Sequence, residues 1–115
     1  MVNAAEVRIL LGSAYSTADV TDETIQAYID LIKHEVADAS ARHKNIAGCT
    51  LNIDVEENAI RIGTCAMTLK ELQNKGASQG LQAQRIIVSA DTMQTYYIKY
   101  HEMLNNMRLG TIYGI

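Results

Sequence analysis

The fold of this chain is decided by residues 21–43, TDETIQAYIDLIKHEVADASARH. Apolar side chains recur there at three- and four-residue steps, which is the period of one face of an α-helix. These positions are Ile25, Tyr28, Ile29, Ile32, Val36 and Ala39 or Ser40. Thr21 is a suitable N-cap, and cations at 42–44 suit the negative end of a helix. We therefore predict a long helix, ~34 Å from end to end, as the spine of the domain.

A short helix is predicted before this spine. Asn3 followed by Glu6 fits a capping box, and Gly12 is a typical helix stop. Between them, Val7, Leu10 and Leu11 form one apolar edge. Residues 13–20 are small and polar, which predicts a loop.

The last predicted helix begins at Ser89 or Asp91 and is closed by Arg108 and Gly110. Its apolar stripe comprises Met93, Tyr96 or Tyr97, Tyr100, Leu104 and Met107. With Ile98 and Met103 the apolar arc becomes wider than a small bundle needs. Tyrosines in such an arc are either core residues with hydroxyls at the rim or interface residues.

The middle of the sequence allows two interpretations. Alternation across 49–62 would suit a short hairpin turning at Glu56-Glu57. The alternative is a helix that begins at Asp54, uses Glu57 in a capping box and ends near Gly76. Its stripe comprises Ala59, Ile62, Ala66, Leu69 and Leu72. Because this stripe is longer than the alternation, we favour the helix, in which Gly63 marks close packing or a weak point. Residues 76–80 would then form a loop.

Composition agrees with an all-α fold. The chain has 115 residues, 48% of them apolar, and no proline, so a single small bundle of about four helices is expected. We assign residues 1–108 to the helical domain and 109–115 to an extended C-terminal tail.

The formal net charge of −3 argues against a domain that wraps nucleic acid. The start of the sequence resembles no signal peptide and no stretch is long enough to span a membrane, which predicts a protein made in the cytoplasm.

No catalytic, cofactor-binding or metal site is predicted. A zinc site would have to combine distant residues that lack the usual ligand spacing, namely His34, His43, His101, Cys49 and Cys65. The acidic patch Asp54, Glu56 and Glu57 is explained by the positive end of a helix. Both cysteines are expected to be free thiols. The sequence thus favours a binding or assembly protein over an enzyme.

The tail gives the strongest indication of a partner. Leu109, Ile112, Tyr113 and Ile115 follow a helix that is already closed, and exposed apolar patches of this size mark interaction surfaces. We predict that these four residues, with Tyr97 on the preceding helix, bind another chain.

Several segments together resemble the head–tail adaptor proteins of long-tailed bacteriophages, also called head-completion or connector proteins. These segments are the short opening helix AAEVRILLG (4–12), the start of the long helix VTDETIQAYI (20–29), the run AMTLKEL (66–72) before Lys75-Gly76, and the tyrosine-rich last helix with its tail. The resemblance covers most of the chain but includes no signature motif.

The resemblance implies a structural virion protein at the head–tail interface. Members of that family form a ring, typically of twelve copies, that binds beneath the portal protein and carries a head-closure or tail protein. The ring extends the channel through which DNA passes, and a mildly acidic wall would not bind phosphates. The tail residues named above would then dock onto the portal.

Two other classes of function stay open. A small helical regulator or inhibitor could bind one host protein through a Tyr- and Met-rich surface, because methionines adapt to varied partners. A minor enzyme subunit could share a site across an interface. A complex with a single non-virion protein would favour the first, and a bound metal or ligand the second.

Overall fold

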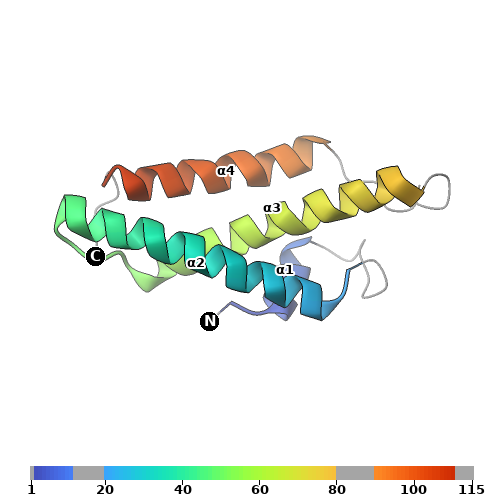
Figure 1. The fold of residues 1–115 in the computed structure, drawn as a ribbon, viewed down its shortest axis with the longest axis horizontal. Coiled ribbons are helices and arrows are strands. Elements are labelled where there is room, and N and C mark those ends of the chain that lie inside the picture. Colours follow the sequence, from blue (N-terminus) through green and yellow to red (C-terminus); the bar gives the residue numbers. More distant parts are fainter. Residues whose placement is uncertain (1, 12–19, 80–89, 111–115) are drawn as a thin grey trace.

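The computed structural model describes residues 2–11, 20–79 and 90–110, and in these ranges the chain is helical without strands. The helices are α1 (Ala4–Leu11), α2 (Asp22–Ala47), α3 (Ile53–Gln79) and α4 (Ala90–Arg108). They form an elongated molecule of 52 × 24 × 18 Å. The predicted small all-α bundle is thereby confirmed (Figure 1). Within the described ranges, no helix is both long and apolar enough to cross a membrane.

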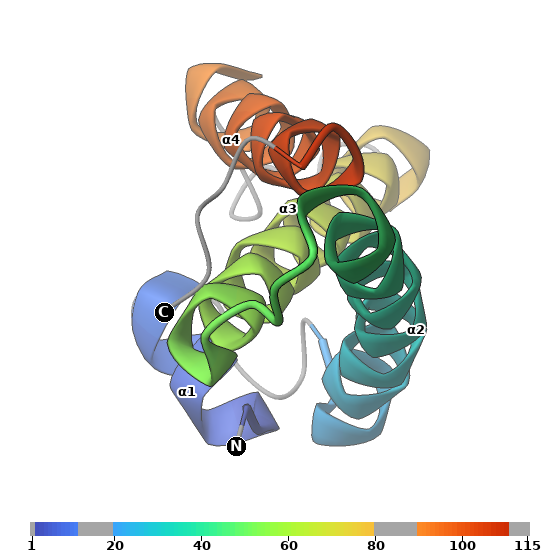
Figure 2. The same ribbon diagram turned by 90° about the vertical axis from the view of Figure 1, so that its left-hand side faces the viewer.

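The three long helices α2, α3 and α4 run along the long axis and contact one another (Figures 1 and 2). The short helix α1 packs on α2 and α3, away from α4 in the end view of Figure 2. Both α2 and α3 contact all the other helices, and among the described residues α3 contributes the most buried apolar side chains. Its middle turns are almost continuously buried between residues 59 and 69.

The long helix predicted from residues 21–43 is confirmed. The Thr21 hydroxyl accepts a hydrogen bond from the Thr24 amide at 3.2 Å, as an N-cap should. At the other end Gly48 has φ +74°, a left-handed conformation that favours glycine, and its amide donates to the Lys44 carbonyl. The buried positions on this helix are Ile25, Ile29, Ile32, Val36, Ala39 and His43.

The middle of the chain is helical, so the alternative hairpin across 49–62 is wrong. All five residues of the predicted helical stripe are buried. The helix begins at Ile53, two residues earlier than a cap at Asp54 would allow, because the Asn52 side chain acts as the cap and accepts the Asp54 amide at 2.8 Å. It also continues through Gly76 to Gln79, so the predicted stop and the loop at 76–80 are wrong. A single glycine costs a helix only about 1 kcal/mol, which neighbouring turns can offset.

Two buried threonines lie on α3 where a purely apolar stripe would be expected. The Thr64 hydroxyl donates to the Ile60 carbonyl at 2.7 Å, and the Thr68 hydroxyl donates to the Thr64 carbonyl at 2.8 Å. Each polar group is therefore satisfied within its own helix, so burial carries little penalty.

The last helix packs through Tyr100, Leu104 and Met107, all buried as predicted. Tyr100 lies directly on Gly63 of α3, where an added Cβ would come within 2.6 Å of the ring. Its hydroxyl donates to the Glu35 carboxylate on α2 at 2.8 Å. Close packing at Gly63 is thus confirmed, and one tyrosine joins all three long helices.

The short first helix begins as predicted, because the Asn3 side chain accepts the Glu6 amide at 3.0 Å. Only part of its predicted apolar edge is buried: Val7 is covered completely, whereas Leu10 is exposed. Two ion pairs hold the helix instead, Glu6 with Arg61 at 2.8 Å and Arg8 with Asp22 at 2.6 Å. An eight-residue helix has room for few core contacts, so its attachment is partly polar.

Replacing Ile32 with Ala should lower the free energy of unfolding by roughly 2–5 kcal/mol, because the side chain is fully buried. The neighbouring Leu31 is 52% exposed, so Leu31→Ala should change stability by no more than about 0.5 kcal/mol. Urea unfolding of both variants provides the comparison. Equal losses for the two variants would show that α2 is oriented differently.

Replacing Gly63 with Ala should destabilise the domain by about 1–3 kcal/mol because the new methyl overlaps the Tyr100 ring. In a Tyr100→Ala background the overlap is absent, and the same change should be neutral or stabilising, since alanine favours helix. A double-mutant cycle measured by urea unfolding tests this coupling. Additive effects would contradict the packing of α4 on α3.

Candidate partner-binding surface

The carboxyl ends of α2 and α4 meet at one end of the bundle (Figure 2). After Arg108 the chain turns at Gly110, whose φ is +67° and whose amide donates to the Met107 carbonyl at 3.1 Å. A Cβ added at Gly110 would lie 2.8 Å from the Cγ2 atom of Ile46. The backbone of the turn therefore rests directly on the last turn of α2, and glycine is needed there for both conformation and space.

Two large apolar side chains are exposed beside this contact. Ile46 is 62% exposed on α2, and Leu109 is 67% exposed directly after α4. We call Ile46, Leu109 and Gly110 the apolar end. Ile53, the first residue of α3, is also exposed, but it lines a separate hollow with Val36 in the middle of α2. Single exposed leucines are ordinary, but a group of them at one end is typical of an interaction surface.

The predicted partner-binding residues have different locations. Leu109 belongs to the apolar end, whereas Tyr97 lies twelve residues earlier, roughly 18 Å away along α4. The structure therefore does not bring these two together. The other three predicted residues, Ile112, Tyr113 and Ile115, lie outside the described residues. Ile46 was not predicted, because no local pattern places the end of α2 beside the end of α4.

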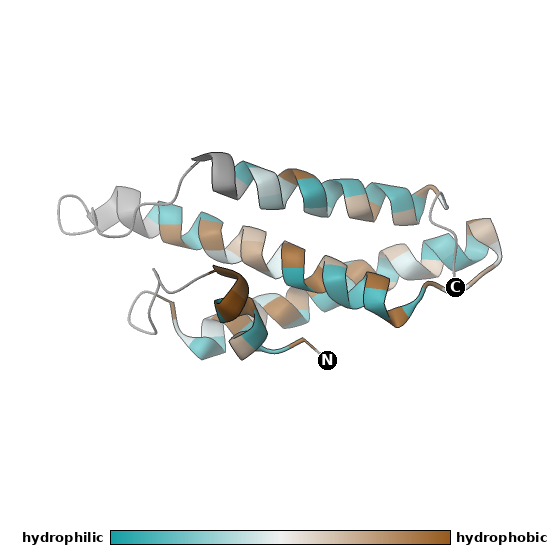
Figure 3. Cartoon of the chain, turned by 180° about the vertical axis from the view of Figure 1, so that it is seen from behind, coloured by the Kyte–Doolittle hydropathy of each residue, from teal (hydrophilic) through white to brown (hydrophobic). Residues whose placement is uncertain are grey.

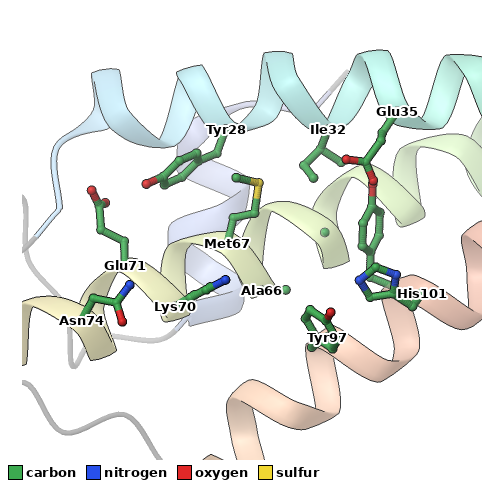
Figure 4. Close-up of a pocket in the computed structure, with 12 residues that line it drawn as sticks. Tyr28, Ile32, Glu35, Ala66, Met67, Lys70, Glu71, Asn74, Tyr97 and His101 are labelled. Atoms are coloured by element: carbon green, nitrogen blue, oxygen red, sulfur yellow. The ribbon is translucent and has the colours of Figure 1, made fainter. Parts of the chain in front are cut away.

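Tyr97 instead borders a cleft of about 420 Å³ between α2, α3 and α4 (Figure 4). Its ring is half-exposed and contacts the His101 ring in a tilted arrangement, with centroids 4.3 Å apart and an interplanar angle of 51°. Tyr28, Tyr100 and Met67 also line the cleft. Among the described tyrosines, Tyr28 and Tyr97 line this cleft, and Tyr100 both lines it and packs in the core.

Charged groups in the cleft lie beside tyrosine hydroxyls. Tyr100 donates to Glu35 at 2.8 Å, and the Tyr28 hydroxyl lies on the same side of the cleft as the Glu71 carboxylate (Figure 4). Burial raises the pKa of Tyr100, and the bond to Glu35 and its charge raise it further. Burial likewise raises the pKa of Tyr28, with smaller contributions from the charge and hydrogen bond of Glu71. Both phenols therefore stay protonated as donors. Neither glutamate was singled out from the sequence, where each looks like an ordinary helix-surface charge.

The histidines and cysteines that could supply metal ligands make other contacts in the structure. Within the described ranges, no three His, Cys, Asp or Glu side chains are placed to hold a metal ion. His43 is buried, with its Nδ1 atom 3.2 Å from the Cys49 carbonyl oxygen. Cys65 is buried as a free thiol, and burial raises its pKa to about 12. Its thiolate is thus a minor form at neutral pH, which makes a reactive or ligating role unfavourable.

The acidic patch at the start of α3 is engaged in structural contacts. Glu56 accepts a hydrogen bond from Ser40 of α2, and Glu57 pairs with Arg61 one turn later at 3.4 Å. Asp54 lies in the first turn, where the helix dipole favours a negative charge. The arrangement stabilises the helix start and its attachment to α2.

A second exposed apolar surface lies on α1. Ile9 is 79% exposed and Leu10 is also exposed, and this end of α1 is the most strongly hydrophobic part of the view in Figure 3. The Tyr96 hydroxyl is 3.4 Å from the Leu10 carbonyl, so one side chain of α4 reaches α1 although the described parts of the two helices do not pack on each other. The chain continues from this point into residues 12–19, which are not described.

No family model, curated protein or solved structure matches the chain in comparisons with known proteins.

A thiol-labelling experiment tests the different environments of the two cysteines. In the native protein at pH 8, a thiol reagent should modify the half-exposed Cys49 and leave Cys65 unmodified, because reaction needs an accessible thiolate. Raising the pH toward 12, or unfolding the protein, should make the Cys65 thiol reactive toward the reagent. Mass spectrometry of native Cys49→Ser should then detect no adduct, and rapid labelling of this variant would contradict the burial of Cys65.

Proposed function

We propose that the chain is a structural head–tail adaptor of a tailed bacteriophage, not an enzyme. In this role copies of the chain form a ring beneath the portal and extend the DNA channel toward the tail. The proposal is supported by the sequence resemblance and by the element order of a short helix, a long spine, a second long helix and a tyrosine-rich last helix. The apolar end is the observation that carries it.

A partner that covers the apolar end would gain binding energy by burying its exposed side chains. Burying one leucine or isoleucine side chain is worth roughly 1.5–3 kcal/mol before ordering costs. Ile46 and Leu109 are each about two-thirds exposed in the isolated chain. The sequence continues from Leu109 into Ile112, Tyr113 and Ile115, so a portal surface that covers the apolar end could also take up this segment.

The remaining surface suits a channel component that does not hold DNA. The outer face of α2 carries both signs of charge, as in the exposed pair of Asp38 and Arg42 at 4.0 Å. The formal net charge is −3. Phosphate binding depends on clustered cations, so DNA should pass such a wall without specific binding.

A small regulator of one host protein is the second candidate. It is favoured by one observation: Tyr97 is exposed beside the half-buried Met67 in the cleft. Aromatic and methionine side chains are frequent in adaptable interfaces. A regulator would form a complex of fixed low stoichiometry with one non-virion protein and would not form rings.

The proposed assembly is tested by measuring the mass of the protein alone and after mixing with purified candidate portal rings. The chain alone should be monomeric or weakly associated, and on a portal it should form a closed ring. Electron microscopy of the mixture should show added density beneath the portal. A stable two-fold dimer as the sole assembled form would contradict the proposal.

Leu109→Asp should weaken portal binding by about tenfold or more, because it removes one buried apolar side chain and adds a charge. The melting temperature should be nearly unchanged, since Leu109 is exposed in the single chain. Leu31→Asp is the matched control, because Leu31 is exposed on α2 but lies roughly 22 Å along the helix from Ile46. Normal portal binding by Leu109→Asp would exclude the apolar end as the docking site.

A further inference from the structure

The cleft between α2, α3 and α4 has the size and lining of a small-molecule site. Its volume of about 420 Å³ lies within the range of about 300–1,000 Å³ that such sites occupy. Its floor is apolar, formed by Ile32, Ala66 and Met67, and the rings of Tyr97 and Tyr100 lie along its α4 side (Figure 4). Most of the polar groups stand at its two ends.

Two carboxylates mark these ends. Glu35 accepts the hydrogen bond of the Tyr100 hydroxyl at one end, and Glu71 lies near the Tyr28 hydroxyl at the other (Figure 4). The bond from Tyr100 holds the Glu35 carboxylate in place. Among the described residues, neither carboxylate forms an ion pair with a lysine, arginine or histidine. In the part of the chain that the structure describes, these two charges are therefore not paired with a cation, and Lys70 is a cationic lining residue that forms a salt bridge with neither.

The spacing of the carboxylates follows from α2. Tyr28, which lies near Glu71, and Glu35 are seven residues apart on α2, which is two helical turns or roughly 10 Å along the axis. A ligand that satisfies both ends needs two positive groups joined by an apolar chain of a few carbons. Tyrosine faces add to the attraction for an ammonium group, and the apolar floor accommodates methylene groups.

We propose that this cleft binds a linear aliphatic diamine, with one ammonium at Glu35 and the other at Glu71. This site is separate from the apolar end, and the inference does not depend on the adaptor role. Lys70 is the one described lysine that lines the cleft. It is exposed and can turn outward, but its charge opposes an incoming cation. Removing that charge should therefore strengthen binding, whereas removing either carboxylate should weaken it.

The test is an NMR titration of the whole chain with 1,4-diaminobutane, followed through the Met67 methyl and the Tyr97 and Tyr100 ring signals. The monoamine 1-aminobutane should bind about threefold to fivefold more weakly, as expected for the loss of one exposed ion pair. Glu35→Gln and Glu71→Gln should each lower the diamine affinity to the level of the monoamine. Lys70→Gln should raise it by a similar factor.

Glu102→Gln is the matched control, because it removes the same charge from an exposed position of α4 that does not line this cleft. It should leave the affinity unchanged. Glu71→Gln and Lys70→Gln leave the Tyr100 hydrogen bond intact, so they test the site even if Glu35→Gln alters the packing. Equal binding of monoamine and diamine, or weaker diamine binding in Lys70→Gln, would overturn the proposal. Cleft signals that respond to a lysine-rich peptide but not to the diamine would also overturn it and indicate a protein partner.

Discussion

The packing of Tyr100 on Gly63 is the contact on which the arrangement of the long helices depends. Gly63 has no side chain, so the tyrosine ring of α4 can lie directly on the backbone of α3. The hydroxyl of the same residue reaches Glu35 on α2. A buried phenol needs such a partner, because an unsatisfied hydroxyl costs roughly 1–3 kcal/mol. The contact therefore fixes both the distance between α3 and α4 and the rotation of α4 about its axis.

Both candidate binding surfaces follow from that placement. With Tyr100 directed inward, Tyr97 faces the cleft one turn earlier. At the carboxyl end of the same helix, Gly110 is brought against Ile46, which leaves Leu109 exposed. The cleft and the apolar end differ in chemistry: the first combines aromatic rings with carboxylates, and the second is aliphatic. They are suited to different partners, a small cation and a protein surface.

Local signals in the sequence were sufficient for the helices but not for the cleft. Thr21 and the cations at 42–44 have mainly local effects, so the ends of α2 could be inferred within a few residues, whereas the Gly48 cap was not predicted. Gly76 was misleading, because a glycine stops a helix only when the chain also turns there. The pairing of Glu35 with Tyr100 spans 65 positions, and each residue alone looks ordinary on its own helix. Interactions between helices therefore required the structure.

The most direct test of this account is an NMR measurement of the contact between Gly63 and Tyr100 in the unmodified protein. The structure predicts nuclear Overhauser effects between the Gly63 Hα protons and the Tyr100 ring protons, because a Cβ at that position would lie within 2.6 Å of the ring. It also predicts a ring-current shift of those Hα protons away from the values of an exposed helical glycine. Unshifted Hα signals without cross-peaks to the ring would contradict the placement of α4 and, with it, both proposed surfaces.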